Sequence, residues 1–170
     1  VYLVVSAFEP IRTNWGDPWS DGNALTSGRY FAQDGFITTR FTPVLDVGAL
    51  RPDSLRYIHY PPLPDLWSGV VQSILGGESL PLQRILAILF SACALALLFL
   101  YVRRFFSEPV AYVATLVIAT NLLFIQYADT IHHIPLYWMT GMAALVAGTH
   151  WLDGGRSRLR AILMTACAMI

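Results

Sequence analysis

Three long stretches without a charged side chain constrain the fold of this chain more than any other feature. Residues 85–102, 109–128 and 134–152 contain no Asp, Glu, Lys or Arg. The hydrocarbon core of a bilayer is about 30 Å thick and takes roughly 20 apolar residues at about 1.5 Å of rise each. Each stretch is close to that length, which predicts an all-α, integral-membrane, polytopic bundle with three complete transmembrane helices.

The composition agrees with a membrane protein. Charged residues make up 13% of the chain, against about 25% in a typical soluble domain. The formal net charge is zero, so nothing in the charge balance favours nucleic acid as a partner. Residues 1–8 and 161–170 are apolar but too short to cross a bilayer. We expect them to be the end and the start of further spans, and residues 1–170 to be a single N-terminal portion of a larger polytopic domain.

Arginines in the short loops predict the orientation. Arg103 and Arg104 follow the first stretch, and the turn over 153–160 is also rich in Arg. Short basic loops stay on the cytoplasmic side. The turn over 129–133 and the long segment 9–84 are then on the periplasmic, extracellular or luminal side.

The outer segment 9–84 is too rich in aromatic residues to be disordered. Residues 21–34 predict a short amphipathic helix that Ser20 or Asp21 caps and that Gly35 ends. A second helix is predicted between Pro61-Pro62 and Gly76-Gly77. We expect both helices to lie along the membrane surface and to contact membrane lipids.

Two acidic residues fall on this outer side, and each has a functional and a structural interpretation. Asp21 can act on a polar group carried by a lipid, or it can simply cap the helix that follows. Asp129 is the one acid between Glu108 and Asp153, and ionisable groups near membrane depth often mark function. His132 and His133 are neighbours and point in different directions on a helix, so they form a poor metal pair.

At this point the chain resembles a known family, the membrane glycosyltransferases of the C-type fold. The resemblance is to the branch of protein O-mannosyltransferases and aminoarabinose transferases (glycosyltransferase family 39-like). It rests on an acidic motif at the start of the first outer loop, a surface helix with a Tyr, a Pro-Pro motif before a second surface helix, and an Arg that opens the next span. These are, in order, Asp21, Tyr30, the run His59-Tyr60-Pro61-Pro62, and Arg84, with the basic aromatic turn Arg103-Arg104-Phe105-Phe106 after the span.

The resemblance implies a glycosyltransferase that moves a sugar from a polyprenyl-phosphate donor to a lipid, glycan or protein acceptor on the outer side. Asp21 would be the general base, with Asp129 as a second catalytic residue. No cofactor or metal site is expected, although a divalent cation stays open because Asp21, Asp129 and a His could converge in the fold. The residues expected to bind substrate are Arg29, Tyr30, His59, Tyr60, Arg84, His132 and His133.

The sequence also departs from the family pattern. Asp21 is followed by Gly22 where the family commonly has Glu, and the family Lys before the Pro pair is absent. His132 or His133 aligns with the family's second acidic position about as well as Asp129 does. Two alternatives therefore remain: a non-catalytic or transport-type polytopic protein, and a receptor or assembly subunit that kept the fold and lost the activity.

Overall fold

The computed structural model describes residues 5–9, 17–46, 50–51, 54–58, 61–131 and 133–152. In these ranges the fold is all-helical, as predicted, and the one extended pairing is an isolated antiparallel bridge between Val44 and Arg56. The helices are α2 (Pro18–Asp34), α3 (Leu63–Leu75), α4 (Leu80–Phe105), α5 (Glu108–Ala119), α6 (Leu122–Tyr127) and α7 (His133–Leu152).

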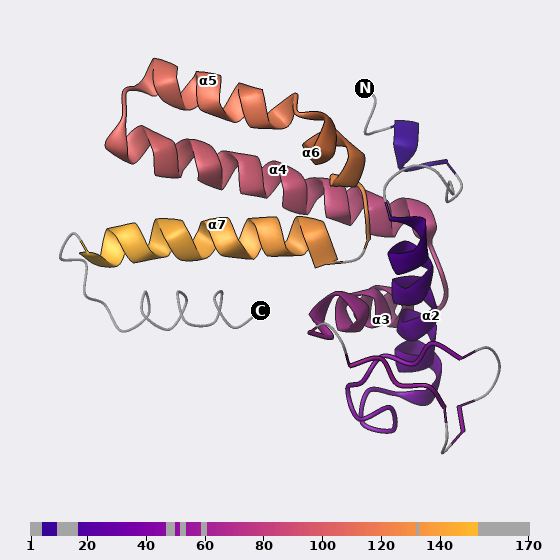
Figure 1. Ribbon diagram of the computed structural model, residues 1–170. Coiled ribbons are helices and arrows are strands. Elements are labelled where there is room, and N and C mark those ends of the chain that lie inside the picture. The colour runs from indigo at the N-terminus through magenta and orange to yellow at the C-terminus, as the bar shows by residue number, and fades with distance from the viewer. Residues whose placement is uncertain are drawn as a thin grey trace.

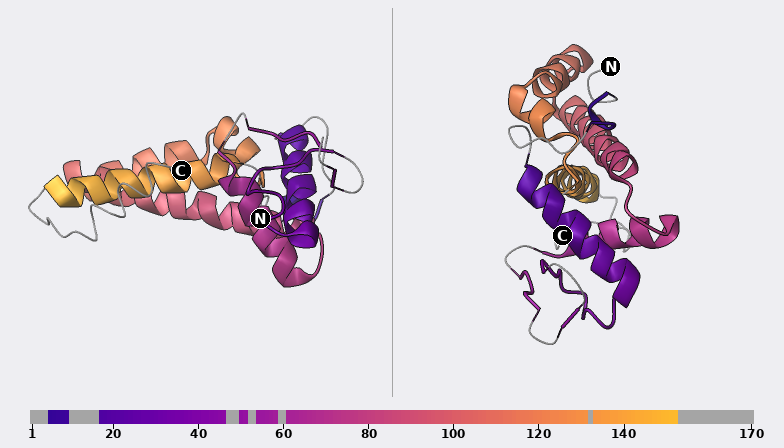
Figure 2. Two further views of the ribbon diagram at one scale, coloured as in Figure 1. Left: turned by 90° about the horizontal axis from the view of Figure 1, so that it is seen from below. Right: turned by 90° about the vertical axis from the view of Figure 1, so that its right-hand side faces the viewer.

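The helices form two groups (Figure 1). The long helix α4 lies between α5 and α7 and packs along both. Helices α2 and α3 pack against each other at one end of this bundle, and α2 runs across the direction of α4 and α7 (Figure 2). The first turn of α4, the turn before α7 and the start of α2 therefore meet at that end.

In the described part of the chain, α4 is the one helix whose length and hydropathy suffice to cross a membrane. It has 26 residues, and its most apolar window has a mean hydropathy of 2.7. It contains the predicted stretch 85–102, and α7 contains the predicted stretch 134–152. The predicted number of spans and their sidedness remain predictions.

The stretch 109–128 differs from the single helix that its composition predicts, because it is divided into α5 and α6. The backbone of Asn121 is extended, with φ −66° and ψ 133°, and its side chain accepts a hydrogen bond from the backbone N–H of Leu123 at 2.9 Å. Asn competes for backbone hydrogen bonds and favours caps over helix interiors. The composition of residues 109–128 is apolar throughout and therefore does not predict this interruption.

Helix α2 begins earlier than predicted, and Asp17 caps it instead of Ser20 or Asp21. The backbone N–H of Ser20 donates to Oδ1 of Asp17 at 3.1 Å, and Pro18 occupies the first helical position, where Pro is favoured. The helix ends before Gly35, as predicted, and the φ of Gly35 is 87°. The carboxyl group of Asp21 is therefore free for a contact other than a cap.

Two glycines allow α2 and α3 to pack closely. A Cβ atom added at Gly69 of α3 would lie 2.5 Å from Cβ of Phe31 in α2. A Cβ atom added at Gly28 of α2 would overlap with the Ser68 side chain of α3. The side-chain amide of Gln72 donates to the backbone carbonyl of Leu25 at 3.0 Å, which adds a buried polar contact between the two helices.

Candidate functional site

Asp21 is buried at the end of the bundle where α2 crosses it. Its side chain is 4% exposed. Oδ1 of Asp21 accepts a hydrogen bond from the backbone N–H of Ile131 at 2.9 Å. This contact joins the first turns of α2 to the turn between α6 and α7, and it places the carboxyl group inside the junction, away from solvent.

Asp129 and Arg84 lie near the Asp21 carboxyl group, close enough for their charges to act on it. Both side chains are buried, with 6% and 7% exposed. The structure thus brings together three of the residues that the sequence singles out. Asp129 comes from the turn between α6 and α7, and Arg84 comes from the first turns of α4.

The surroundings of Asp21 change its acidity. Together they raise the pKa of Asp21 from the ordinary 3.8 to about 7; burial is the largest cause, and the negative charges of Asp129 and Asp17 contribute to the rise. The Ile131 N–H bond and the Arg84 cation oppose the rise, because both stabilise the carboxylate. A carboxyl group with a pKa of about 7 can take a proton and release it at neutral pH.

The guanidinium group of Arg84 is fixed by the chain that precedes α2. Its Nη1 donates to the backbone carbonyl oxygens of Ser6 and Glu9 at 2.8 and 2.6 Å. Its Nε is buried and has no hydrogen-bond partner in the described part of the chain. Arg84 therefore holds the 5–9 segment against α4 and also supplies a positive charge beside Asp21.

His133 opens α7 on the same side of the junction. It is half-buried, and its ring centroid lies 5.3 Å from that of Tyr137. The charge of Asp17, which caps α2, acts on both His133 and Asp21. The cluster of Asp17, Asp21, Arg84, Asp129 and His133 is called the junction site below.

Arg29 and Tyr30 do not join the junction site. They lie about two turns farther along α2, roughly 12 Å from Asp21 at about 1.5 Å of rise per residue. The hydroxyl group of buried Tyr30 donates to the backbone carbonyl of Asp46 at 3.0 Å. Arg29 lies over the Tyr30 ring, with 5.8 Å between its Cζ and the ring centroid. Tyr30 is therefore part of the packing between α2 and the following loop, whereas Arg29 lines a pocket between α2 and the end of α3.

Three predicted site residues, His59, Tyr60 and His132, lie outside the described residues. In the ranges that are described, no group of three or more His, Cys, Asp or Glu side chains is arranged to hold a metal ion.

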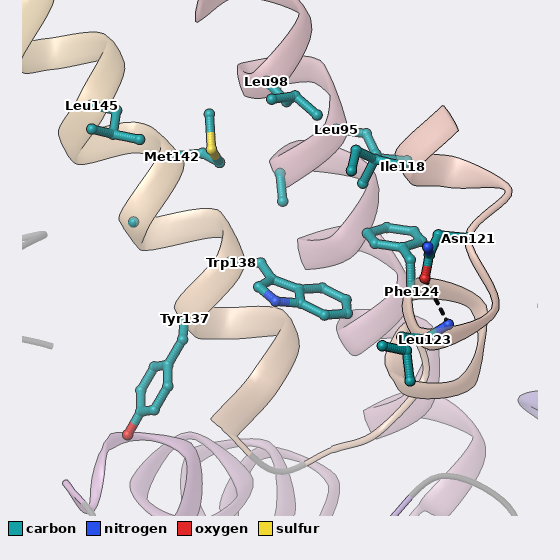
Figure 3. A pocket seen from close by; sticks show the side chains of 12 residues that line it. Leu95, Leu98, Ile118, Asn121, Leu123, Phe124, Tyr137, Trp138, Met142 and Leu145 are labelled. Atoms are coloured by element: carbon teal, nitrogen blue, oxygen red, sulfur yellow. Dashed lines mark hydrogen bonds between the residues drawn. The ribbon is translucent and has the colours of Figure 1, made fainter. Parts of the chain in front are cut away.

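An apolar groove opens beside the bundle near the junction site. It has a volume of about 770 Å³ and lies between α4, α7 and the α5–α6 break (Figure 3). The rings of Phe124 and Trp138 stack in its wall, with centroids 4.8 Å apart. Asn121, which caps α6, also reaches this wall (Figure 3). One helical turn separates Tyr137 in the groove from His133 in the junction site.

Two acidic residues outside the predicted site, Asp17 and Asp65, also have defined roles or environments in the structure. Asp17, which caps α2, also adds negative charge to the junction site. The Asp17-Pro18 pair is a helix-start signature that indicates the capping role, whereas no local pattern indicates the effect of Asp17 on Asp21. Asp65, in the first turn of α3, is 3% exposed, and burial raises its pKa to about 6. Its burial depends on the packing of α3 against α2, which no local pattern predicts.

Comparisons with protein-family models, with curated proteins and with solved structures gave no match to this chain. A functional assignment therefore rests on the residues and contacts of the junction site.

Proposed function

We propose that this chain is part of an integral-membrane glycosyltransferase that moves a sugar from a polyprenyl-phosphate donor to a lipid, glycan or protein acceptor on the non-cytoplasmic face. Asp21 would be the general base that takes the proton from the acceptor nucleophile. The observation that carries the proposal is the convergence of Asp21, Asp129 and Arg84 at one end of the bundle.

The acidity of Asp21 fits the proposed role. A general base works best when its pKa lies near the working pH, and the Asp21 pKa of about 7 meets that condition. Asp129 would assist by keeping Asp21 basic, and Arg84 would supply positive charge near the phosphate of the donor, for which a guanidinium group is suited. In this proposal His59, Tyr60 and His132 also contact the substrate.

The helical bundle supports the lipid part of the proposal. Helix α4 is long and apolar enough to cross a membrane. The groove beside it is lined almost entirely by apolar side chains, and its wall comes within one helical turn of the junction site. An isoprenoid chain in this groove would place its phosphate near the polar end of the bundle.

One observation favours the transport-type alternative. The interruption of the apolar stretch at Asn121 resembles the broken helices of transporters, whose substrate sites lie at such breaks. Asn121 is uncharged, and the ionisable residues gather at the junction site instead. This distribution favours chemistry at the membrane surface, and transport remains the second candidate.

The experiment that tests the proposal is a transfer assay with the protein in lipid vesicles. A panel of radiolabelled polyprenyl-phosphate sugars is supplied with membrane extract as acceptor. We expect transfer of label by the wild type and a loss of about 10²–10⁴-fold in Asp21→Asn, the usual range for a general base. Asp34→Asn is the matched control, because Asp34 lies on the same helix and is exposed. Label that crosses the vesicle membrane with its chemical linkage unchanged would contradict the proposal and support transport.

A further inference from the structure

Gln83 has a buried side-chain amide that is only half satisfied. It lies in the first turn of α4, is 5% exposed, and its Oε1 accepts a hydrogen bond from the hydroxyl group of Ser68 in α3 at 2.8 Å. Its Nε2 is buried and has no hydrogen-bond partner among the described residues. A buried donor without an acceptor is destabilising, so an acceptor is expected beside this amide.

A small cavity lies against Gln83. Its volume is about 10 Å³, and one buried water needs a cavity of about 10–15 Å³ with two to four polar partners. The wall combines residues of α3, α4 and α7 with the turn before α7: Pro64, Trp67, Gln83, Ala87, Phe90, Thr130, Ile131, Pro135 and Leu136. The cavity is therefore the size of one water molecule, and the polar side-chain atoms of its wall belong to Gln83, Thr130 and the indole of Trp67.

Thr130 supplies a hydrogen-bond acceptor for such a water. Its hydroxyl proton is donated to the backbone carbonyl of Tyr127 at 2.9 Å, so its oxygen is left to accept. Thr130 is 2% exposed. The next residue, Ile131, donates its backbone N–H to Asp21.

We propose that Gln83 is a positioning residue for Asp21, and that it acts through one buried water which accepts from Gln83 Nε2 and donates to Thr130. The water holds the 129–131 turn, so that the Ile131 N–H stays directed at Asp21. This relay connects Ser68 of α3, Gln83 of α4 and the turn before α7 to the carboxyl group on α2. Its link to catalysis rests on the proposed function, whereas the relay itself does not.

The test measures the proton affinity of Asp21 directly. The carbonyl infrared band of protonated Asp21 is identified as the band that Asp21→Asn removes, and it is titrated in the intact protein in lipid. Asp17, Asp129 and Arg84 also act on Asp21, and the variants below leave these three charges unchanged. Gln83→Met keeps the approximate size of the side chain and removes its amide.

We expect Gln83→Met to raise the Asp21 midpoint by roughly half to one pKa unit, because a looser Ile131 N–H bond stabilises the carboxylate less. Thr140→Val is the matched control. It also removes a buried polar group, but one that donates to the backbone carbonyl of Leu136 within α7 and does not line the cavity. The control midpoint should stay within about 0.2 of the wild type.

A second variant keeps the proposal testable if Gln83→Met does not fold. Thr130→Val removes the acceptor with little change in shape and should raise the Asp21 midpoint in the same way. An unchanged midpoint in the variants that fold would overturn the relay, and so would an equal rise in Thr140→Val. The infrared readout needs no sugar donor, so sugar transfer can fail while the relay stands.

Discussion

The backbone N–H of Ile131 donates to Oδ1 of Asp21 at 2.9 Å across 110 residues of sequence. This bond joins α2 to the turn before α7, where Asp129 also lies. One hydrogen bond thereby fixes the geometry of the helix crossing and stabilises the charged form of the proposed base. Substitutions at Asp21 should separate these two effects.

Asp21→Ala should destabilise the protein, whereas Asp21→Asn should not. Alanine leaves the buried Ile131 N–H without its acceptor, at a cost of about 1–3 kcal/mol in the free energy of unfolding. Asparagine keeps an acceptor oxygen in nearly the same place. Thermal unfolding of both variants in the same detergent at pH 5 makes the comparison. Equal destabilisation by the two substitutions would show that the Ile131 bond is not what Asp21 contributes.

The stability of the protein should fall as pH rises from about 4 to about 7. The pKa values of Asp65 and Asp21 are raised to about 6 and about 7 from the ordinary 3.8. Between the ordinary and the raised values the folded chain binds more protons than the unfolded chain, so the free energy of unfolding decreases with pH. Asp65→Asn should remove the part of this decrease that ends near pH 6, and Asp21→Asn the part that ends near pH 7. The free energy of unfolding is measured in steps from pH 4 to pH 8. If its slope against pH is unchanged in one of the variants, that Asp does not cause the part of the decrease assigned to it.

Gly69→Ala should loosen the packing of α3 against α2. The added Cβ would lie 2.5 Å from Cβ of Phe31, an atom fixed to the α2 backbone, so the helices must separate. We expect a loss of about 1–3 kcal/mol in the free energy of unfolding, as for other overpacked sites. Gly22→Ala is the control, because nothing lies within 4 Å of a Cβ at Gly22. The unfolding of both variants is measured in the same detergent, and Gly22→Ala should not lower the free energy of unfolding. If Gly22→Ala lowers it as much as Gly69→Ala does, the packing argument is wrong.

Removal of the Arg84 charge should raise the pKa of Asp21. The Arg84 cation favours the carboxylate, and a neutral side chain of similar length, as in Arg84→Met, takes that effect away. Arg84→Lys keeps a positive charge and should give a smaller rise. The infrared titration of Asp21 measures both shifts. A midpoint that falls in Arg84→Met would show that Arg84 does not stabilise the Asp21 carboxylate.

Local sequence patterns predicted much of the fold. The charge-free stretches gave α4 and α7, and the glycines after α2 and α3 mark where those helices end, with Gly76 in the left-handed conformation at φ 71°. The order of apolar stretches and polar turns also placed Asp21 and Asp129 at the same end of the bundle. These predictions depend on residues that are close in sequence or on the alternation of apolar stretches with polar turns.

The remaining features depend on contacts that local patterns do not encode. The break at Asn121 is a competition between a capping side chain and an apolar stretch that is long enough for one helix. The burial of Asp65 follows from the close approach of α2 and α3 at Gly28 and Gly69. The partner of Asp21 is a backbone N–H, which carries no residue-type signal in the sequence.

The measurement that tests the proposed function most directly is the pH dependence of sugar transfer in the wild type and in Asp21→Asn. The wild-type rate should rise with pH, with a midpoint near 7, because the base must be ionised to accept a proton. Asp21→Asn should lose this rise together with about 10²–10⁴-fold of the rate. A folded Asp21→Asn variant that keeps the full rate and the same rise with pH would contradict the assignment of Asp21 as the base.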